Sequence, residues 1–166
     1  MKVIVALDQT DYAKHIVDAV ASSHYPLDTQ IKILTVVEPL HWDSACCLEW
    51  NKEAANAQEK RKHLANEIAM GARLKIQKAS PHCNVHVEIR FGDPKEEIIT
   101  SATEWMADRL IVGAHGHSPN RFFHGSVARS IAQYCGCTVQ LIRYKEERQK
   151  GRQKLKSEKS SIAVVN

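Results

Sequence analysis

The sequence predicts a domain of the α/β class, with three layers and a five-stranded parallel sheet in the middle. Short apolar runs of strand length alternate with segments of helical periodicity, in the order β-α-β-α-β-α-β-α-β. Such alternation produces right-handed crossovers and a parallel sheet covered by helices on both faces. The length of 166 residues suits one compact domain.

The first half of the chain supplies two strands and two helices. Residues 2–7 form an apolar run that suits a strand buried on both faces. Thr10 or Asp11 is placed to cap the next helix, whose apolar residues from 13 to 21 recur at helical spacing. A second strand is predicted at 31–37. A loop over 40–50 then leads to a long helix over 51–78, whose weak apolar stripe consists of Ala54, Ala57, Leu64, Ile68, Ala72 and Ile76.

The second half supplies three strands and two helices. Residues 85–90 alternate between apolar and polar types, as a less buried strand does, and strands are also predicted at 109–112 and 138–142. Asp93 and Pro94 are typical of a cap and a first helical residue. The inner faces of the two helices are predicted to hold Ile98, Ile99 and Ala102 in the first, and Val127, Ile131 and Ala132 in the second.

The positive charge is confined to one end of the chain. Residues 145–166 contain seven basic and three acidic residues and so account for the whole net charge of +4. The neutral remainder argues against a nucleic-acid binder, whose folded surface should be basic. We therefore expect a folded domain over 1–143 and a solvated, charged tail over 144–166.

The number of cysteines and the absence of long apolar runs indicate the cellular location that we expect. Five cysteines, an odd number, and no signal peptide argue against a secreted disulfide framework, so we expect a reducing, cytoplasmic location. No stretch approaches the roughly 18 apolar residues of a membrane span. Cys135 and Cys137 lack the second pair of ligands that a zinc site needs, so we predict packed cysteines and no metal site.

Residues 112–127, VGAHGHSPNRFFHGSV, form the candidate binding segment, because they run from a predicted strand end to a predicted helix start. Gly113 and Gly116 let backbone N–H groups approach an anion closely. Gly125 and Ser126 open a helix whose free N–H groups and dipole favour phosphate. Positive charge would come from His115, His117 and Arg121. Glycine pairs at such a junction also often only form the turn, so the spacing alone leaves a purely structural role open.

The same segment resembles the motif of the universal stress protein family, Gly-x-x-Gly, nine residues, then Gly-Ser or Gly-Thr. The resemblance extends over residues 1–143. It includes Asp8 after the first strand, the second strand ending in TVVEP at 35–39, the Gly-Asp-Pro turn at 92–94 and DRLIVG at 108–113. It implies a Rossmann-like fold, similar to the adenine nucleotide alpha hydrolases.

The resemblance also implies where an adenine nucleotide would bind. Ala6 and Asp8 would line the adenosine end, with Asp8 near the ribose, and the backbone of Val36 would contact adenine. The phosphates would be wrapped by Gly113, His115, Gly116, His117 and Ser118. The helix start would close the site with Gly125, Ser126, Val127 and Ala128.

One departure from the family motif bears on the nucleotide. Eight residues, 117–124, separate Gly116 from Gly125 instead of nine, and Pro119 removes an N–H donor from this segment. We predict ATP as the ligand, with or without magnesium, and leave AMP or another adenine nucleotide open.

The sequence predicts a binding module more strongly than an enzyme. It has no Gly-x-Ser-x-Gly elbow and no Gly-Lys-Ser/Thr phosphate loop, so we predict no dedicated catalytic residue and at most slow ATP hydrolysis. The family resemblance implies a homodimer through residues 138–143 that acts in a stress response through an unidentified protein partner. The alternatives are a nucleotide-free interaction dimer of the same fold and a slow ATPase or autophosphorylating protein with Ser126 as acceptor.

Overall fold

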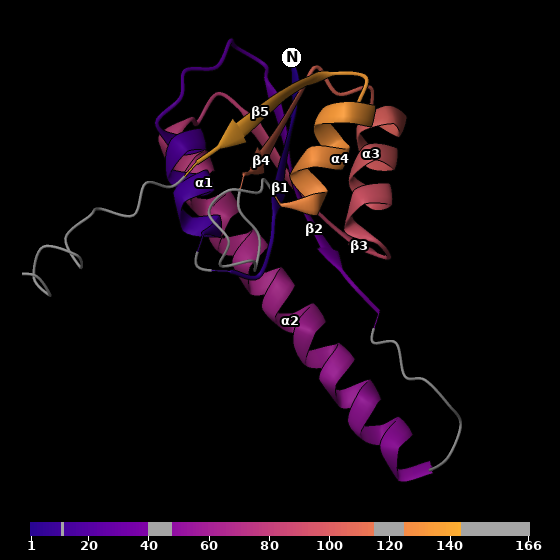
Figure 1. Cartoon of the computed structure of the whole chain (residues 1–166). Coiled ribbons are helices and arrows are strands. Elements are labelled where there is room, and N and C mark those ends of the chain that lie inside the picture. The colour runs from indigo at the N-terminus through magenta and orange to yellow at the C-terminus, as the bar shows by residue number, and fades with distance from the viewer. Residues whose placement is uncertain (11, 40–47, 115–124, 144–166) are drawn as a thin grey trace, which may run out of the picture.

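The fold is a single parallel sheet with helices on both faces (Figure 1). A computed structural model describes residues 1–10, 12–39, 48–114 and 125–143, the side chains of 48–54 excepted. The strands are β1 (Lys2–Leu7), β2 (Gln30–Val37), β3 (Asn84–Phe91), β4 (Arg109–Gly113) and β5 (Thr138–Ile142). They lie in the order β3-β2-β1-β4-β5, and every neighbouring pair is parallel. The predicted class and element order are confirmed.

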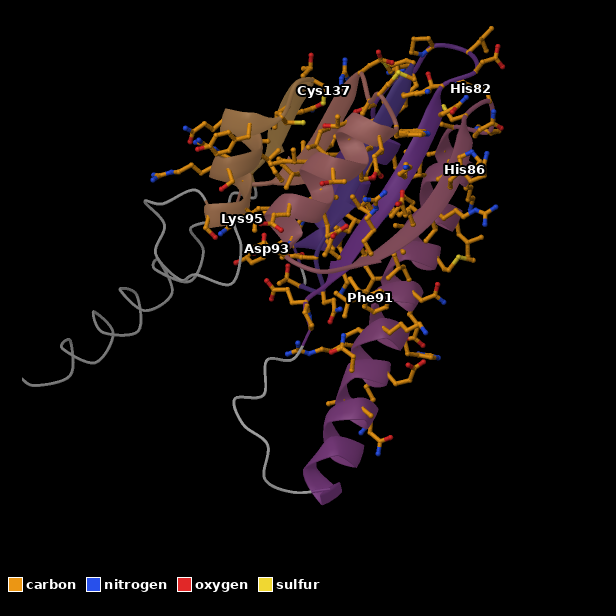
Figure 2. All side chains as sticks on the ribbon, turned by 90° about the vertical axis from the view of Figure 1, so that its right-hand side faces the viewer. His82, His86, Phe91, Asp93, Lys95 and Cys137 are labelled. Carbon is orange, nitrogen blue, oxygen red and sulfur yellow. The ribbon has the colours of Figure 1, made fainter. Side chains whose placement is uncertain are left out.

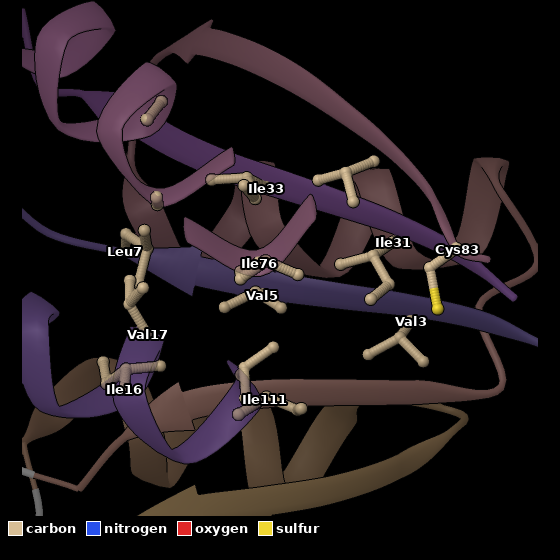
Figure 3. Packing of buried hydrophobic residues seen from close by; sticks show 14 of the residues in the cluster. Val3, Val5, Leu7, Ile16, Val17, Ile31, Ile33, Ile76, Cys83 and Ile111 are labelled. Atoms are coloured by element: carbon tan, nitrogen blue, oxygen red, sulfur yellow. The ribbon is translucent and has the colours of Figure 1, made fainter. Parts of the chain in front are cut away.

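Two helices cover each face of the sheet. The helices are α1 (Ala13–Ala21), α2 (Leu48–Ala79), α3 (Pro94–Glu104) and α4 (Ser126–Tyr134). Figure 3 shows the core beneath α1 and α2, where Ile16 and Ile76 face Val5 and Ile33 of the sheet. On the other face, Leu34, Leu110 and Ile131 are fully buried beneath α3 and α4. The middle strand β1 contributes to both cores, because alternate residues point to opposite faces.

The long helix α2 packs on the sheet only in its C-terminal half. Its buried residues are Ala65, Ala69, Ala72 and Ile76. The predicted stripe is therefore partly wrong: Leu64 is 44 % exposed, and small alanines take the inner positions because they let the helix approach the strands closely. In α4, Ala132 is likewise exposed, and Ala128 lies inside with Ile131.

The length of α2 exceeds what the sheet can cover. Its 32 residues span about 48 Å, whereas the longest strands, with 8 residues, span about 26 Å. The N-terminal part of α2 consequently extends beyond the rest of the domain (Figure 1). Among the described residues, no helix combines the length and the apolar character needed to cross a membrane.

Two helix starts differ in how they are capped. Asp93 caps α3 as predicted, since its carboxylate accepts hydrogen bonds from the amides of Lys95 and Glu96 at 2.8 and 3.4 Å. Tyr12 occupies the cap position of α1 without a side-chain hydrogen bond, so the predicted capping role of Thr10 is wrong, and Asp11, the alternative cap, lies outside the described residues. Instead, the hydroxyl of Thr10 donates to Asp8 Oδ1 at 2.6 Å.

An ionic network joins the edge strand β3 to its neighbours. Glu88 accepts from Lys32 Nζ at 2.6 Å, and Arg90 donates to Glu88 and to Glu104 of α3. Partial burial alone would raise the pKa of Glu88, but the hydrogen bonds from Lys32 and Arg90 outweigh it and hold that pKa below its usual range. The network therefore keeps the carboxylate of Glu88 ionised where β2, β3 and α3 meet.

Candidate functional site

A cleft of about 520 Å³ opens at the carboxyl ends of β1, β2 and β4. The sheet order changes direction between β1 and β4, because the chain first builds outward through β2 and β3 and then returns to build through β4 and β5. Loops diverge at such a point and leave a crevice for a ligand. The lining residues are Ala6, Leu7, Asp8, Gln9, Tyr12, Ile16, Leu34, Val36, Val37, Glu38, Arg61, Pro94, Ile98, Val112, Gly113, Gly125, Ser126, Val127 and Ala128.

Every predicted binding residue that the structure describes lies on this cleft. They come from four different elements or their ends: Ala6 and Asp8, Val36, Gly113, and Gly125 with Ser126, Val127 and Ala128. The other predicted residues, His115, Gly116, His117 and Ser118, fall within 115–124, outside the described residues. The sequence motif thus identifies the cleft, although its central segment is not placed.

Asp8 is held in position by its own turn. Its Oδ1 accepts hydrogen bonds from the amide of Thr10 at 3.3 Å and from the Thr10 hydroxyl at 2.6 Å. An aspartate that bonds to the backbone two residues later stabilises a tight turn at a strand end. One carboxylate oxygen is therefore engaged in the turn, while the residue stands directly at the end of the central strand on the cleft.

The two ends of the candidate phosphate segment are fixed beside each other. The amide of Gly125 donates to the carbonyl of Ala114 at 3.2 Å, and the amide of Ala114 donates to Ile142 of β5 at 2.9 Å. Gly125 is the cap residue of α4, and among the described residues no side-chain hydrogen bond caps this helix start. The first amides of α4 are thus available on the cleft, where the helix dipole adds positive potential.

The opposite rim of the cleft is formed by residues that the sequence did not single out. Gln9 Nε2 donates to the carbonyl of Arg61 at 3.2 Å, and Arg61 Nη1 lies 3.5 Å from the carbonyl of Glu38. These contacts attach α2 to the ends of β1 and β2. Glu38 directly follows a predicted strand and Gln9 is the second residue after another, which is a signal for both. No sequence signal distinguishes Arg61 from the other basic residues of the long helix.

The start of α3 forms a further part of the cleft lining. Gly92 has a φ of +150°, a conformation that favours glycine, and a Cβ there would lie 2.9 Å from the Glu97 side chain. This turn brings Pro94 and Ile98 to the cleft. Figure 2 shows Phe91, Asp93 and Lys95 at this end of the sheet, with His82 and Cys137 at the other.

Apolar side chains form part of the lining of the cleft. Val36, Ile98 and Val112 supply an apolar surface of the kind that accepts the flat face of a base. Within the described part of the chain, no cluster of three or more potential metal ligands is present. The arrangement therefore suits a ligand with an apolar, planar part and an anionic group.

Comparison with known proteins identifies the family of the chain. The model of the universal stress protein family matches residues 1–143. The chain belongs to the universal stress protein family. It is also 27 % identical over 146 residues to a Staphylococcus aureus (strain USA300) protein that is provisionally named a universal stress protein, an overlap of 87 % of this chain and 84 % of the other.

Solved structures of universal stress proteins share the fold. UspA from Lactobacillus plantarum superposes with a TM-score of 0.70 at 21 % identity, covering 86 % of this chain and 97 % of that one. A family member from Arabidopsis thaliana, solved with AMP bound, gives a TM-score of 0.57 at 17 % identity, with 87 % and 92 % covered. The predicted family and the Rossmann-like fold are confirmed.

Proposed function

We propose that the cleft binds an adenine nucleotide, with the phosphate at the N-terminus of α4 and the base toward the end of β2. The observation that carries this proposal is the convergence of Asp8, Val36, Gly113 and the start of α4 on one cleft. Backbone amides at a helix start bind phosphate through hydrogen bonds and the dipole. The apolar surface of Val36 would then contact the base.

Related proteins support an adenine nucleotide as the ligand. Besides the Arabidopsis protein with AMP, universal stress proteins of similar fold have been solved in complex with cAMP and, from Archaeoglobus fulgidus, with dAMP. We extend the proposal to ATP for this chain, because residues 115–124 are long enough to supply donors for outer phosphates. Magnesium would accompany ATP as a counter-ion for those phosphates.

Calorimetric titration of the full chain with AMP, with ATP and magnesium, and with GMP tests this function. We expect micromolar binding of AMP, corresponding to about −8 kcal/mol. GMP should bind at least about tenfold more weakly than AMP. The exocyclic groups of guanine differ from those of adenine and present a different hydrogen-bonding edge to the end of β2. ATP binding tighter than AMP binding would show that residues 115–124 contact the outer phosphates.

The absence of binding heat and of a thermal shift with every nucleotide would overturn the proposal. The protein would then be best described as a nucleotide-free interaction module of the same fold. Equal affinity for AMP and GMP would preserve a phosphate site but would remove the assignment of adenine.

We also propose that two copies pair through the exposed edge of β5 and that this dimer acts in a stress response. An edge strand presents unpaired N–H and C=O groups, and β5 is the edge of this sheet beside α4. A shallow groove of about 350 Å³ adjoins it, lined by Ala128, Arg129, Ala132, Gln133 and Leu141. A second copy could cover the edge and the groove together.

Replacing Gln140 by lysine is expected to weaken the dimer. Gln140 is exposed in the middle of β5, so an antiparallel pair would bring the two introduced charges together, and like charges across a strand pair are destabilising. Sedimentation velocity should show a dimer for the wild type and a monomer for Gln140→Lys. Asn84→Lys, on the opposite edge strand β3, is the matched control and should remain dimeric. A wild-type monomer, or a Gln140→Lys dimer of unchanged affinity, would contradict the pairing.

A further inference from the structure

Two cysteines lie in direct contact at the junction of α4 and β5. Their sulfur atoms are 3.4 Å apart, a distance at which one thiol hydrogen-bonds to the other. Cys135 ends α4, where its amide donates to the carbonyl of Ile131 at 2.9 Å, and Cys137 directly precedes β5. The end of α4 and the start of β5 therefore hold the two cysteines close to each other in the fold.

The environment of the pair differs from that of the third described cysteine. Cys83 is buried, with 2 % of its surface exposed, whereas Cys135 and Cys137 are both partly exposed. Gly136 between them is exposed and has no atom within 4 Å of a Cβ position. A small solute can consequently reach the pair, and the connecting residue has room to adjust.

The surroundings of Cys137 hold its thiol in the protonated form. Burial, together with the hydrogen bond to Cys135, raises the pKa of Cys137 to about 11. Cys137 therefore keeps its proton near neutral pH, and its thiol can hydrogen-bond to the sulfur of Cys135. Two neighbouring thiols exchange with a disulfide through a mixed-disulfide intermediate.

We propose that Cys135 and Cys137 form a reversible dithiol–disulfide pair that reacts with low-molecular-weight disulfides such as glutathione disulfide. The site lies at the amino end of β5, at the opposite end of the sheet from the carboxyl-end cleft (Figure 2). Its chemistry is thus independent of nucleotide binding. Closing the disulfide requires the sulfurs to approach to about 2.05 Å, a shift of little more than a bond length.

The reaction balances as a two-electron exchange. One cysteine thiol loses its proton, and the thiolate attacks a sulfur of glutathione disulfide, whose S–S bond breaks and releases one glutathione thiolate. The second cysteine thiol then loses its proton and attacks the cysteine sulfur of the mixed disulfide, which releases the second glutathione. The two released protons end on the two glutathione thiolates. One protein disulfide forms, and one glutathione disulfide is reduced.

Trypsin offers a direct readout, because cleavage after Arg129 and Arg143 leaves both cysteines, and no others, in the peptide 130–143. The native full chain is equilibrated in glutathione buffers of increasing disulfide content, quenched in acid, alkylated and digested. We expect this peptide to become two hydrogen masses lighter and resistant to alkylation. The peptide 79–90, which contains Cys83, should remain alkylated at the same ratios.

The fold-dependent part of the proposal is tested by repeating the titration in urea. Since the fold already holds the sulfurs in contact, the native chain should be half oxidised at a ratio of glutathione disulfide to glutathione at least about tenfold lower than the unfolded chain. Cys137→Ser should give only a single glutathione adduct on Cys135. A native chain that yields only mixed disulfides, or that oxidises no more readily than the unfolded chain, would overturn the proposal.

Discussion

Replacing Ser126 by glutamate is expected to abolish the binding of phosphate-bearing nucleotides while the fold remains intact. Ser126 is the exposed first residue of α4 and lines the cleft. A carboxylate there would occupy the anion position and repel a phosphate by about 4 kcal/mol at a separation of 4 Å and an effective dielectric constant near 20. We expect the affinity for AMP to fall at least about a hundredfold, as measured by calorimetry.

The stability of the same variant should not decrease. A negative side chain in the first turn of a helix interacts favourably with the dipole, by about 0.3–1 kcal/mol. Thermal unfolding without nucleotide therefore serves as an internal check that loss of binding is not loss of structure. Ser130→Glu places the same charge one turn further along α4, away from the cleft lining, and should reduce the affinity for AMP by less than about threefold.

Adenosine provides a second discriminating ligand. It lacks phosphate, so Ser126→Glu should change its affinity far less than that of AMP. If the variant binds AMP as well as the wild type does, the phosphate is not at the start of α4, even if the cleft holds a nucleotide. If adenosine and AMP lose affinity equally, the glutamate blocks the cleft by its size and the charge argument fails.

The sequence was sufficient for the fold because this architecture is built from local signals. Each buried strand reads as a short apolar run, and Asp93 with Pro94 marks a helix start by chemistry that acts within one turn. The errors arise where tertiary packing decides the outcome. Leu64 fits the predicted stripe of α2 but is 44 % exposed, because the neighbouring Ala65, which is fully buried, faces the sheet in its place.

The site was predicted from the sequence only as far as its residues follow strand ends and helix starts. Asp8, Val36 and Gly125 fall on the cleft because parallel strands present their carboxyl ends at one edge. Arg61 was not foreseen, since its place on the rim depends on how α2 crosses the sheet. The contact between Cys135 and Cys137 likewise needed the structure, because a Cys-Gly-Cys sequence does not by itself fix the direction of either side chain.

Truncating Leu110 to alanine is expected to produce the largest loss of stability among single changes outside the cleft. Leu110 is fully buried in β4 beneath α3 and α4, with Ile4, Leu34 and Ile131 in the same core. Removing a buried leucine side chain costs the transfer free energy and leaves a cavity, about 3 kcal/mol in total. Urea denaturation should show this decrease, and the melting temperature should fall by about 10 °C.

Leu74→Ala is the matched control, because it is the same substitution at a position of α2 that is 70 % exposed. It should change the free energy of unfolding by less than about 0.5 kcal/mol. Leu110→Met, which conserves volume, should cost less than about 1.5 kcal/mol and keeps the comparison measurable if the alanine variant does not fold. Equal decreases in the free energy of unfolding for Leu110→Ala and Leu74→Ala would mean that the core beneath α3 and α4 does not stabilise the sheet. The position of α4 would then have to be set by the hydrogen bond between Gly125 and Ala114 rather than by packing.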